Sequence, residues 1–110
     1  MQATATAPAA TIARGLIIKT AFLGPTSYKG SRVSASHKRD NETTYRAIVD
    51  WHHDCDAEQN HCRAAQTLLN KLNADRERMF IDLGIEPPPA LQIVGAGWDN
   101  DNYFFMAALP

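Results

Sequence analysis

A chain of 110 residues with 45% hydrophobic and 21% charged residues has room for one domain with a single modest core. These fractions are ordinary for a soluble globular chain. No apolar run is long enough to span a bilayer, and the opening MQATATAPAATIA lacks the basic start and continuous apolar run of a signal peptide. We expect a cytoplasmic protein with a disordered tail at 1–13 and one domain at 14–110.

The charge is unevenly divided, although the formal net charge is only −1. Residues 1–46 carry seven basic residues against two acidic ones, and residues 47–110 carry four against ten. Such asymmetry predicts a positive face and a negative face, which favour charged partners. The alternative is that both sets only solvate opposite surfaces. Two cysteines, Cys55 and Cys62, are few for an exported domain, so we expect reduced thiols.

Three strands are predicted in the first half of the chain. Residues 15–24, GLIIKTAFLG, are rich in β-branched and apolar residues and end at Gly-Pro. Residues 31–38, SRVSASHK, alternate strictly between apolar and polar positions, which is typical of a half-buried strand. Residues 43–51, TTYRAIVDW, form the third strand. The short connections between them predict an antiparallel meander.

One long helix is predicted next. Asp56 is a good N-cap, and Gln59 completes a capping box with it. Apolar residues then recur at helical spacing until Gly84 ends the pattern. Asn73 and Asp75 weaken the middle of this pattern, so two shorter helices are the alternative.

A hairpin is predicted at the C-terminal end. The proline run at 86–90 forms a stiff connector that cannot belong to a central strand. Two apolar segments, 91–98 and 103–109, then flank the turn sequence DNDN. The order β-β-β-α-β-β predicts an α+β fold, with an antiparallel sheet of about five strands and one long helix packed on one face.

The loop FLGPTSYKGSR resembles a phosphate-binding loop only superficially. Such a loop places Lys and Ser or Thr after its second glycine, directly before a helix. Here Lys29 precedes Gly30, and a strand follows. We expect a hairpin connection whose tip, Tyr28 and Lys29, can contact a partner.

The stretch WHHDCDAEQNHC holds five side chains that can ligate zinc: His52, His53, Cys55, His61 and Cys62. The spacing disfavours a site, because adjacent helical residues such as His61 and Cys62 point about 100° apart. We therefore expect no metal and no cofactor. A metal site around His53, Cys55 and His61 is the alternative.

A Cys-His nucleophile is the second chemistry that this stretch suggests. Cys55 precedes a helix N-terminus, where a thiolate is stabilised, and His52 and His53 are near it in sequence. A nucleophile also needs an oxyanion site and an enclosed cleft, and nothing in the sequence indicates either one. We therefore expect no enzymatic activity.

Two charged surfaces are predicted. One is a basic sheet face that can meet phosphates, and its residues are Lys19, Arg32, Lys38 and Arg46. No exposed aromatic residue is evident for base stacking, because Phe22, Tyr45 and Trp51 are expected to face the core. The other surface is acidic, and its residues are Asp50, Asp54, Asp56, Glu58, Asp99 and Asp101.

The chain resembles a family of small proteins of phages, plasmids and integrated elements over most of residues 16–106. The matching features are FLGPTSYKGSRVSAS, Trp51 with His53, Asn60 with His61, Ala64 with Ala65, Lys71 with Leu72, and the strands IVGAG and YFF. The segment Asn73–Asp82 departs from the family as an insertion that lengthens the helix, and the N-terminal tail is extra.

The resemblance implies a non-enzymatic mobile-element protein. We expect a monomer or homodimer in the cytoplasm of a bacterial host. Some proteins of similar layout look like anti-CRISPR inhibitors, so the leading hypothesis is inhibition of a CRISPR-Cas effector by steric block or DNA mimicry. The expected partner-binding residues are Asp54, Asp56, Glu58, Asp99 and Asp101, with Tyr28 and Lys29 as a second patch. The resemblance assigns His53, Asn60 and His61 to a structural lock. The alternative is a nucleic-acid-binding accessory protein that uses the basic sheet face.

Overall fold

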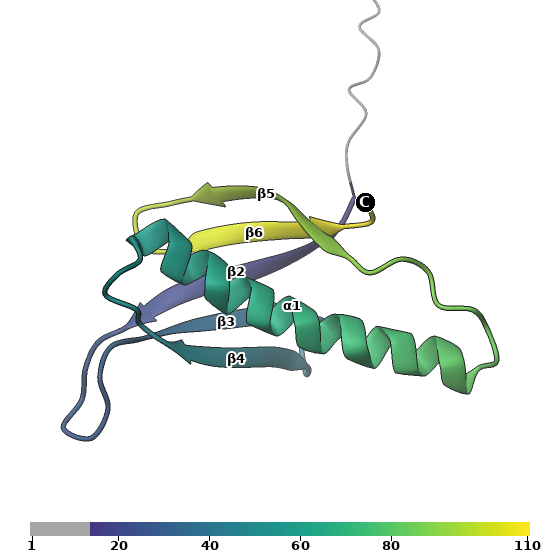
Figure 1. The fold of residues 1–110 in the computed structure, drawn as a ribbon, viewed down its shortest axis with the longest axis horizontal. Helices are drawn as coiled ribbons and strands as arrows, with labels where there is room; N and C mark the ends of the chain where they lie inside the picture. The colour runs from purple at the N-terminus through teal and green to yellow at the C-terminus, as the bar shows by residue number, and fades with distance from the viewer. Residues whose placement is uncertain (1–13) are drawn as a thin grey trace, which may run out of the picture.

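The computed structural model describes residues 14–110, so the expected tail at 1–13 lies outside the described residues. The elements are β2 (Leu16–Leu23), β3 (Arg32–Lys38), β4 (Thr44–Asp50), α1 (Ala57–Asp82), β5 (Gln92–Trp98) and β6 (Tyr103–Ala108) (Figure 1). This order and the packing of one helix on one sheet confirm the predicted α+β fold.

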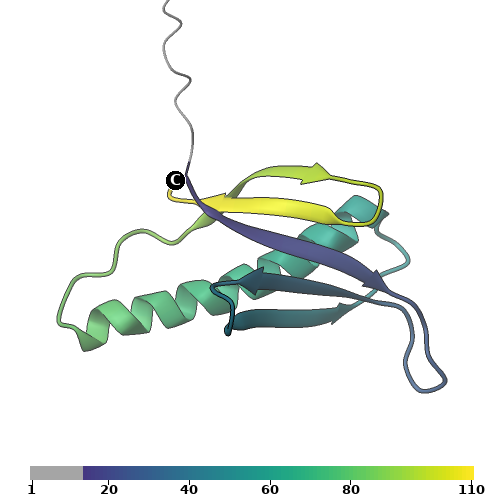
Figure 2. The ribbon, with the colours of Figure 1, turned by 180° about the vertical axis from the view of Figure 1, so that it is seen from behind.

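The five strands form one antiparallel sheet in the order β4-β3-β2-β6-β5. The first three strands form the predicted meander, and the C-terminal hairpin joins it through the pairing of β6 with β2. Helix α1 crosses one face of the sheet, and among the described residues no element covers the opposite face (Figures 1 and 2). We call the uncovered side the open face.

The core lies between α1 and the sheet. The buried apolar side chains of the strands are Ile18, Val33, Ala35, Ala47, Phe105, Ala107 and Ala108. Ala64, Ala65, Leu68 and Leu69 meet most of them from the helix. The two alanines bring the helix close to the strands near its N-terminal end, and the two leucines fill the space further along.

Helix α1 is one unbroken helix, as predicted. The capping box is present: Gln59 N donates to Asp56 Oδ1 at 2.8 Å, and Asp56 N donates to Gln59 Oε1 at 2.9 Å. Gly84 follows the helix with a φ of +73°, a conformation that favours glycine. Asn73, expected to weaken the helix, instead hydrogen-bonds both backbone groups of Leu91 and so holds the connector to β5.

Asn60 joins the end of β4 to the first turn of α1. Its side chain is fully buried, and its Oδ1 accepts a hydrogen bond from His52 N at 2.8 Å. Its Nδ2 donates to the carbonyls of His52, Cys55 and Asp56, at 2.9, 3.3 and 3.0 Å. One amide therefore satisfies backbone groups of a connection that has no regular structure.

We predict that Asn60→Ala lowers the free energy of unfolding by about 3 kcal/mol, because buried backbone groups lose their partners. Urea unfolding measures this loss. The matched control is Asn70→Ala, because Asn70 is exposed on the same helix and bonds only to the Gln66 side chain. Equal stability losses in the two variants would contradict the role given to Asn60.

Candidate functional site

The open face carries a row of side chains that crosses all five strands. Arg46 pairs with Ser36, Ser36 with Lys19, Lys19 with Phe104, and Phe104 with Gly97. Cross-strand partners project from the same side of a sheet, so these residues share a face. Lys19 identifies this face as the open one, because it is exposed between two buried neighbours that point toward α1.

The other two predicted basic residues lie on the same face. Lys38 pairs with Thr44, and Arg32 pairs with Leu23 and Asp50 toward the opposite end of the strands. Among residues 14–110 the one salt bridge joins Arg78 and Asp75 on the helix. The four basic residues of the open face therefore have no salt-bridge partner in the described chain, and Arg32 Nε is buried without a hydrogen-bond partner.

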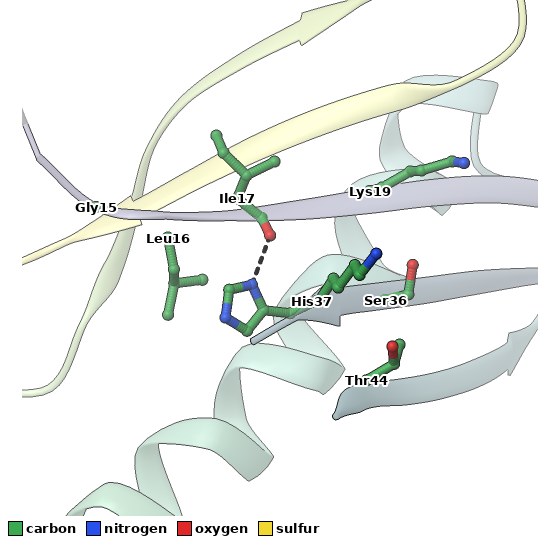
Figure 3. Close-up of a pocket in the computed structure, with 8 residues that line it drawn as sticks. Gly15, Leu16, Ile17, Lys19, Ser36, His37 and Thr44 are labelled. Carbon is green, nitrogen blue, oxygen red and sulfur yellow. Dashed lines mark hydrogen bonds between the residues drawn. The ribbon is translucent and has the colours of Figure 1, made fainter. Parts of the chain in front are cut away.

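A hollow of about 580 Å³ opens beside this row at one end of β2 and β3 (Figure 3). Lys19, Lys38 and Thr44 line it together with His37. His37 Nδ1 donates to the carbonyl of Ile17 at 2.8 Å, since a carbonyl can only accept. The hollow therefore combines two ammonium groups with the hydroxyls of Ser36 and Thr44 and an imidazole ring.

A second hollow, of about 210 Å³, lies further along the open face. It is lined by Ile17, Gly95, Gly97, Phe104 and Met106, with Ala96 beside them. Because Gly95 and Gly97 have no side chains, no large side chain of β5 lies beside the Phe104 ring. A Cβ added at either glycine would meet nothing within 4 Å, so this hollow is open space.

Phe104 adds a half-buried aromatic ring to this face, which the sequence analysis did not anticipate. It stands next to Lys19 across the strands, while Phe105 points into the core. Tyr45 and Trp51 pack against the core, as predicted. Phe22 lies edge-on to Trp51, with ring centroids 5.3 Å apart, but remains 50% exposed.

The acidic residues gather at one end of the sheet, which we call the acidic end. The β4–α1 connection carries Asp54 and Asp56, α1 begins with Glu58, and the β5–β6 turn carries Asp99 and Asp101 (Figure 1). Contact between the rings of His61 and Tyr103, with centroids 4.4 Å apart, places the two segments side by side. The sixth acidic residue, Asp50, ends β4 on the open face, opposite Arg32.

Two carboxylates of the acidic end bind local backbone. Asp56 caps α1, and Asp99 Oδ1 accepts from Asp101 N and Asn102 N at 2.8 Å each. These backbone bonds hold the pKa of Asp99 below its ordinary value, with a smaller contribution from Lys19. Asp54, Glu58 and Asp101 have no such bond among the described residues, so they remain available to a partner.

The tip of the β2–β3 connection projects beyond the sheet (Figure 1). Thr26 organises this turn, because its Oγ1 accepts from Tyr28 N at 3.2 Å and from Lys29 N at 3.0 Å. Tyr28 is 95% exposed. The loop is the predicted hairpin connection, and it presents an aromatic ring and an ammonium group to solvent.

The predicted lock involves Asn60 and His61 but not the His53 side chain. His61 is buried, its Nδ1 lies 2.7 Å from Thr20 Oγ1 in a hydrogen bond, and Trp51 meets its ring edge-on. His53 is exposed, and its side chain has no hydrogen bond within the described chain. The alternative metal site is also not assembled, because His61 is occupied in the core. His52, Asp54 and Cys55 come together instead.

No helix of the described chain combines the length and the apolar character needed to cross a membrane. Comparisons with models of protein families, with curated proteins and with solved structures find no match for this chain. The resemblance to small mobile-element proteins therefore stays a prediction that rests on the sequence motifs.

We predict that stability falls as the pH drops below about 6.5, partly because of His61. Burial lowers the pKa of His61 from its ordinary value of 6.5, so the folded state resists a proton that the unfolded state accepts. Urea unfolding between about pH 7.5 and about pH 5.5 measures the fall. His61→Gln should reduce it, whereas His53→Ala at the exposed neighbour should not. An unchanged pH dependence in His61→Gln would contradict this assignment.

Proposed function

We propose that this protein acts by binding, and that its open face binds the phosphate backbone of a nucleic acid. One observation carries the proposal: four basic side chains share an uncovered sheet face and have no salt-bridge partner among the described residues. Basic side chains that meet phosphates release condensed counterions, which is the main source of nucleic-acid affinity. Because the basic side chains of the open face form no ion pairs in the described chain, they can bind phosphates without first losing such pairs.

The polar neighbours of these basic residues support the same ligand. Ser36 lies between Arg46 and Lys19 in the row, and Ser34 lies one pair further along β3. Hydroxyl groups donate to phosphate oxygens and fix the register of a bound strand. Phe104 adds an aromatic ring beside Lys19, and such rings stack with unpaired bases. The open face therefore offers both charge and a stacking surface, a combination typical of single-strand binders.

We predict that Lys19→Gln with Arg46→Gln weakens binding of a labelled single-stranded oligonucleotide about tenfold or more at low salt. The slope of log affinity against log salt should also become shallower, by about 0.7 for each phosphate that the variant no longer neutralises. Fluorescence anisotropy between about 50 and 200 mM salt measures both quantities.

Lys71→Gln is the matched control, because Lys71 is an exposed base on the helix and outside the open face. It should leave the affinity and the slope near those of the parent protein. If the control lost as much log affinity per removed charge as the double variant, only total charge would matter. Failure of the parent protein to bind either single-stranded or duplex nucleic acid would remove the proposal.

A second candidate function is inhibition of a CRISPR-Cas effector through the acidic end, as the sequence resemblance suggested. The observation in its favour is that two segments distant in sequence bring acidic groups to one end of the molecule. Three of these acids, Asp54, Glu58 and Asp101, make no bond to local backbone in the described chain. Carboxylates spread over such an end can occupy a basic nucleic-acid channel by charge complementarity.

We predict that Asp54→Asn, Glu58→Gln and Asp101→Asn together reduce capture of a stoichiometric effector complex from bacterial host lysate several-fold. The effect should be larger at low salt, because long-range attraction is screened as salt rises. Glu77→Gln, an exposed acid near the other end of the helix, is the control. Capture that is unaffected by the triple variant would contradict this second function and leave the first one standing.

A further inference from the structure

We infer that His52, Asp54 and Cys55 form a binding site for a divalent transition metal ion, with Zn²⁺ as the best match. One ligand atom from each side chain lies within 4.8 Å of the other two. The three residues belong to the β4–α1 connection at the acidic end. The alternative metal site considered from the sequence used His53 and His61 as its histidine ligands, and neither belongs to this cluster.

The donor set suits zinc. One nitrogen, one sulfur and one carboxylate oxygen are the three donor types that Zn²⁺ takes from proteins. Metal–ligand distances of about 2.0 to 2.3 Å place the ligand atoms of a tetrahedral site about 3.3 to 3.7 Å apart. The side chains must therefore close by about 1 Å, which rotation about their own bonds can supply while the backbone stays in place.

The backbone that carries these ligands is held in place. Asn60 binds both the N–H and the carbonyl of His52 and also the carbonyl of Cys55. Cys55 N donates to the carbonyl of His52 at 3.1 Å, which closes the turn. The capping box at Asp56 fixes the segment on its other side. Binding of an ion here costs little in chain ordering, because the turn is formed before the ion arrives.

The neighbouring base does not block the site. Arg63 Nη2 lies 3.2 Å from His52 Nε2, within hydrogen-bond distance. Arg63 also donates to the carbonyl of Asp50 at 3.2 Å and to Asn60 Oδ1 at 3.1 Å. These two bonds can hold the guanidinium if the histidine turns toward an ion.

Three protein ligands leave one tetrahedral position for water or for a side chain of a partner. His52 and Asp54 are exposed and Cys55 is half-buried, so solvent and a partner can both reach the ion. A bound ion links residues that lie directly between β4 and α1. It therefore stabilises the folded chain in proportion to its occupancy.

The test is a titration of the metal-free, reduced full-length protein with Co²⁺, followed by displacement with Zn²⁺. We expect saturation at one equivalent, with a thiolate-to-cobalt band in the near ultraviolet that Zn²⁺ abolishes. Cys55→Ser should remove this band. His52→Ala and Asp54→Asn should weaken Co²⁺ binding by more than about 100-fold, the upper end of the loss typical of a residue that only supports a ligand. Zn²⁺ should raise the unfolding temperature of the parent protein but not of His52→Ala.

Cys62→Ser and His53→Ala are the matched controls. Each removes a thiol or an imidazole that does not belong to the cluster. Both should bind Co²⁺ like the parent protein. The inference is overturned if the parent shows no saturable thiolate band, or if the band depends on Cys62 or His53 instead. Circular dichroism checks that each variant is folded before its titration is interpreted, so loss of the fold cannot pass for loss of the site.

Discussion

The packing of one helix on one side of the sheet is the constraint on which the rest of the molecule depends. At its N-terminal end α1 is fixed by the side chains of two successive buried residues. Asn60 holds the end of β4, and His61 reaches Thr20 on the central strand. Further along, Leu68 and Leu69 fill the space above the strands. Because this packing uses a single side of the sheet, the other side stays uncovered by any element of the described chain.

The character of the open face follows from the period of two along each strand. On β2 the residue between the buried Ile18 and Thr20 must point away from the helix, and this residue is Lys19. The same alternation directs Ser34 and Ser36 of β3 outward. If the basic residues of the open face only interacted with water, they would not require an aromatic ring beside them. The position of Phe104 next to Lys19 is the feature that favours a ligand over simple solvation.

The fold was largely predictable because its elements carry strong local signals. Alternation in β3 and the capping box of α1 each depend on residues close in sequence, and both were predicted correctly. Pairing of β6 with β2 depends on residues more than 80 positions apart, such as Ile18 and Phe105, and no local pattern indicates it. The run YFFMAA is apolar throughout, so its sequence does not tell which phenylalanine faces outward.

The acidic end shows where prediction of the site was limited. Adjacent residues of an irregular connection can point in any direction, so sequence spacing did not show which of His52 and His53 lies beside Asp54 and Cys55. Asn60 decides this direction by binding the His52 backbone, and that interaction depends on how β4 meets the helix. The role of Asn73 was missed for the same reason. Its partner, Leu91, lies on a connector whose path is set by tertiary packing, so the sequence showed only a residue that interrupts the helical pattern.

Whether the open face is the functional surface can be tested by titrating isotopically labelled protein with a short single-stranded oligonucleotide and following the amide chemical shifts. We expect the largest changes on β2, β3, β4 and β6, centred on Lys19, Ser36, Arg46 and Phe104. Changes confined to the acidic end, or no changes at low salt, would contradict the role that we assign to the open face.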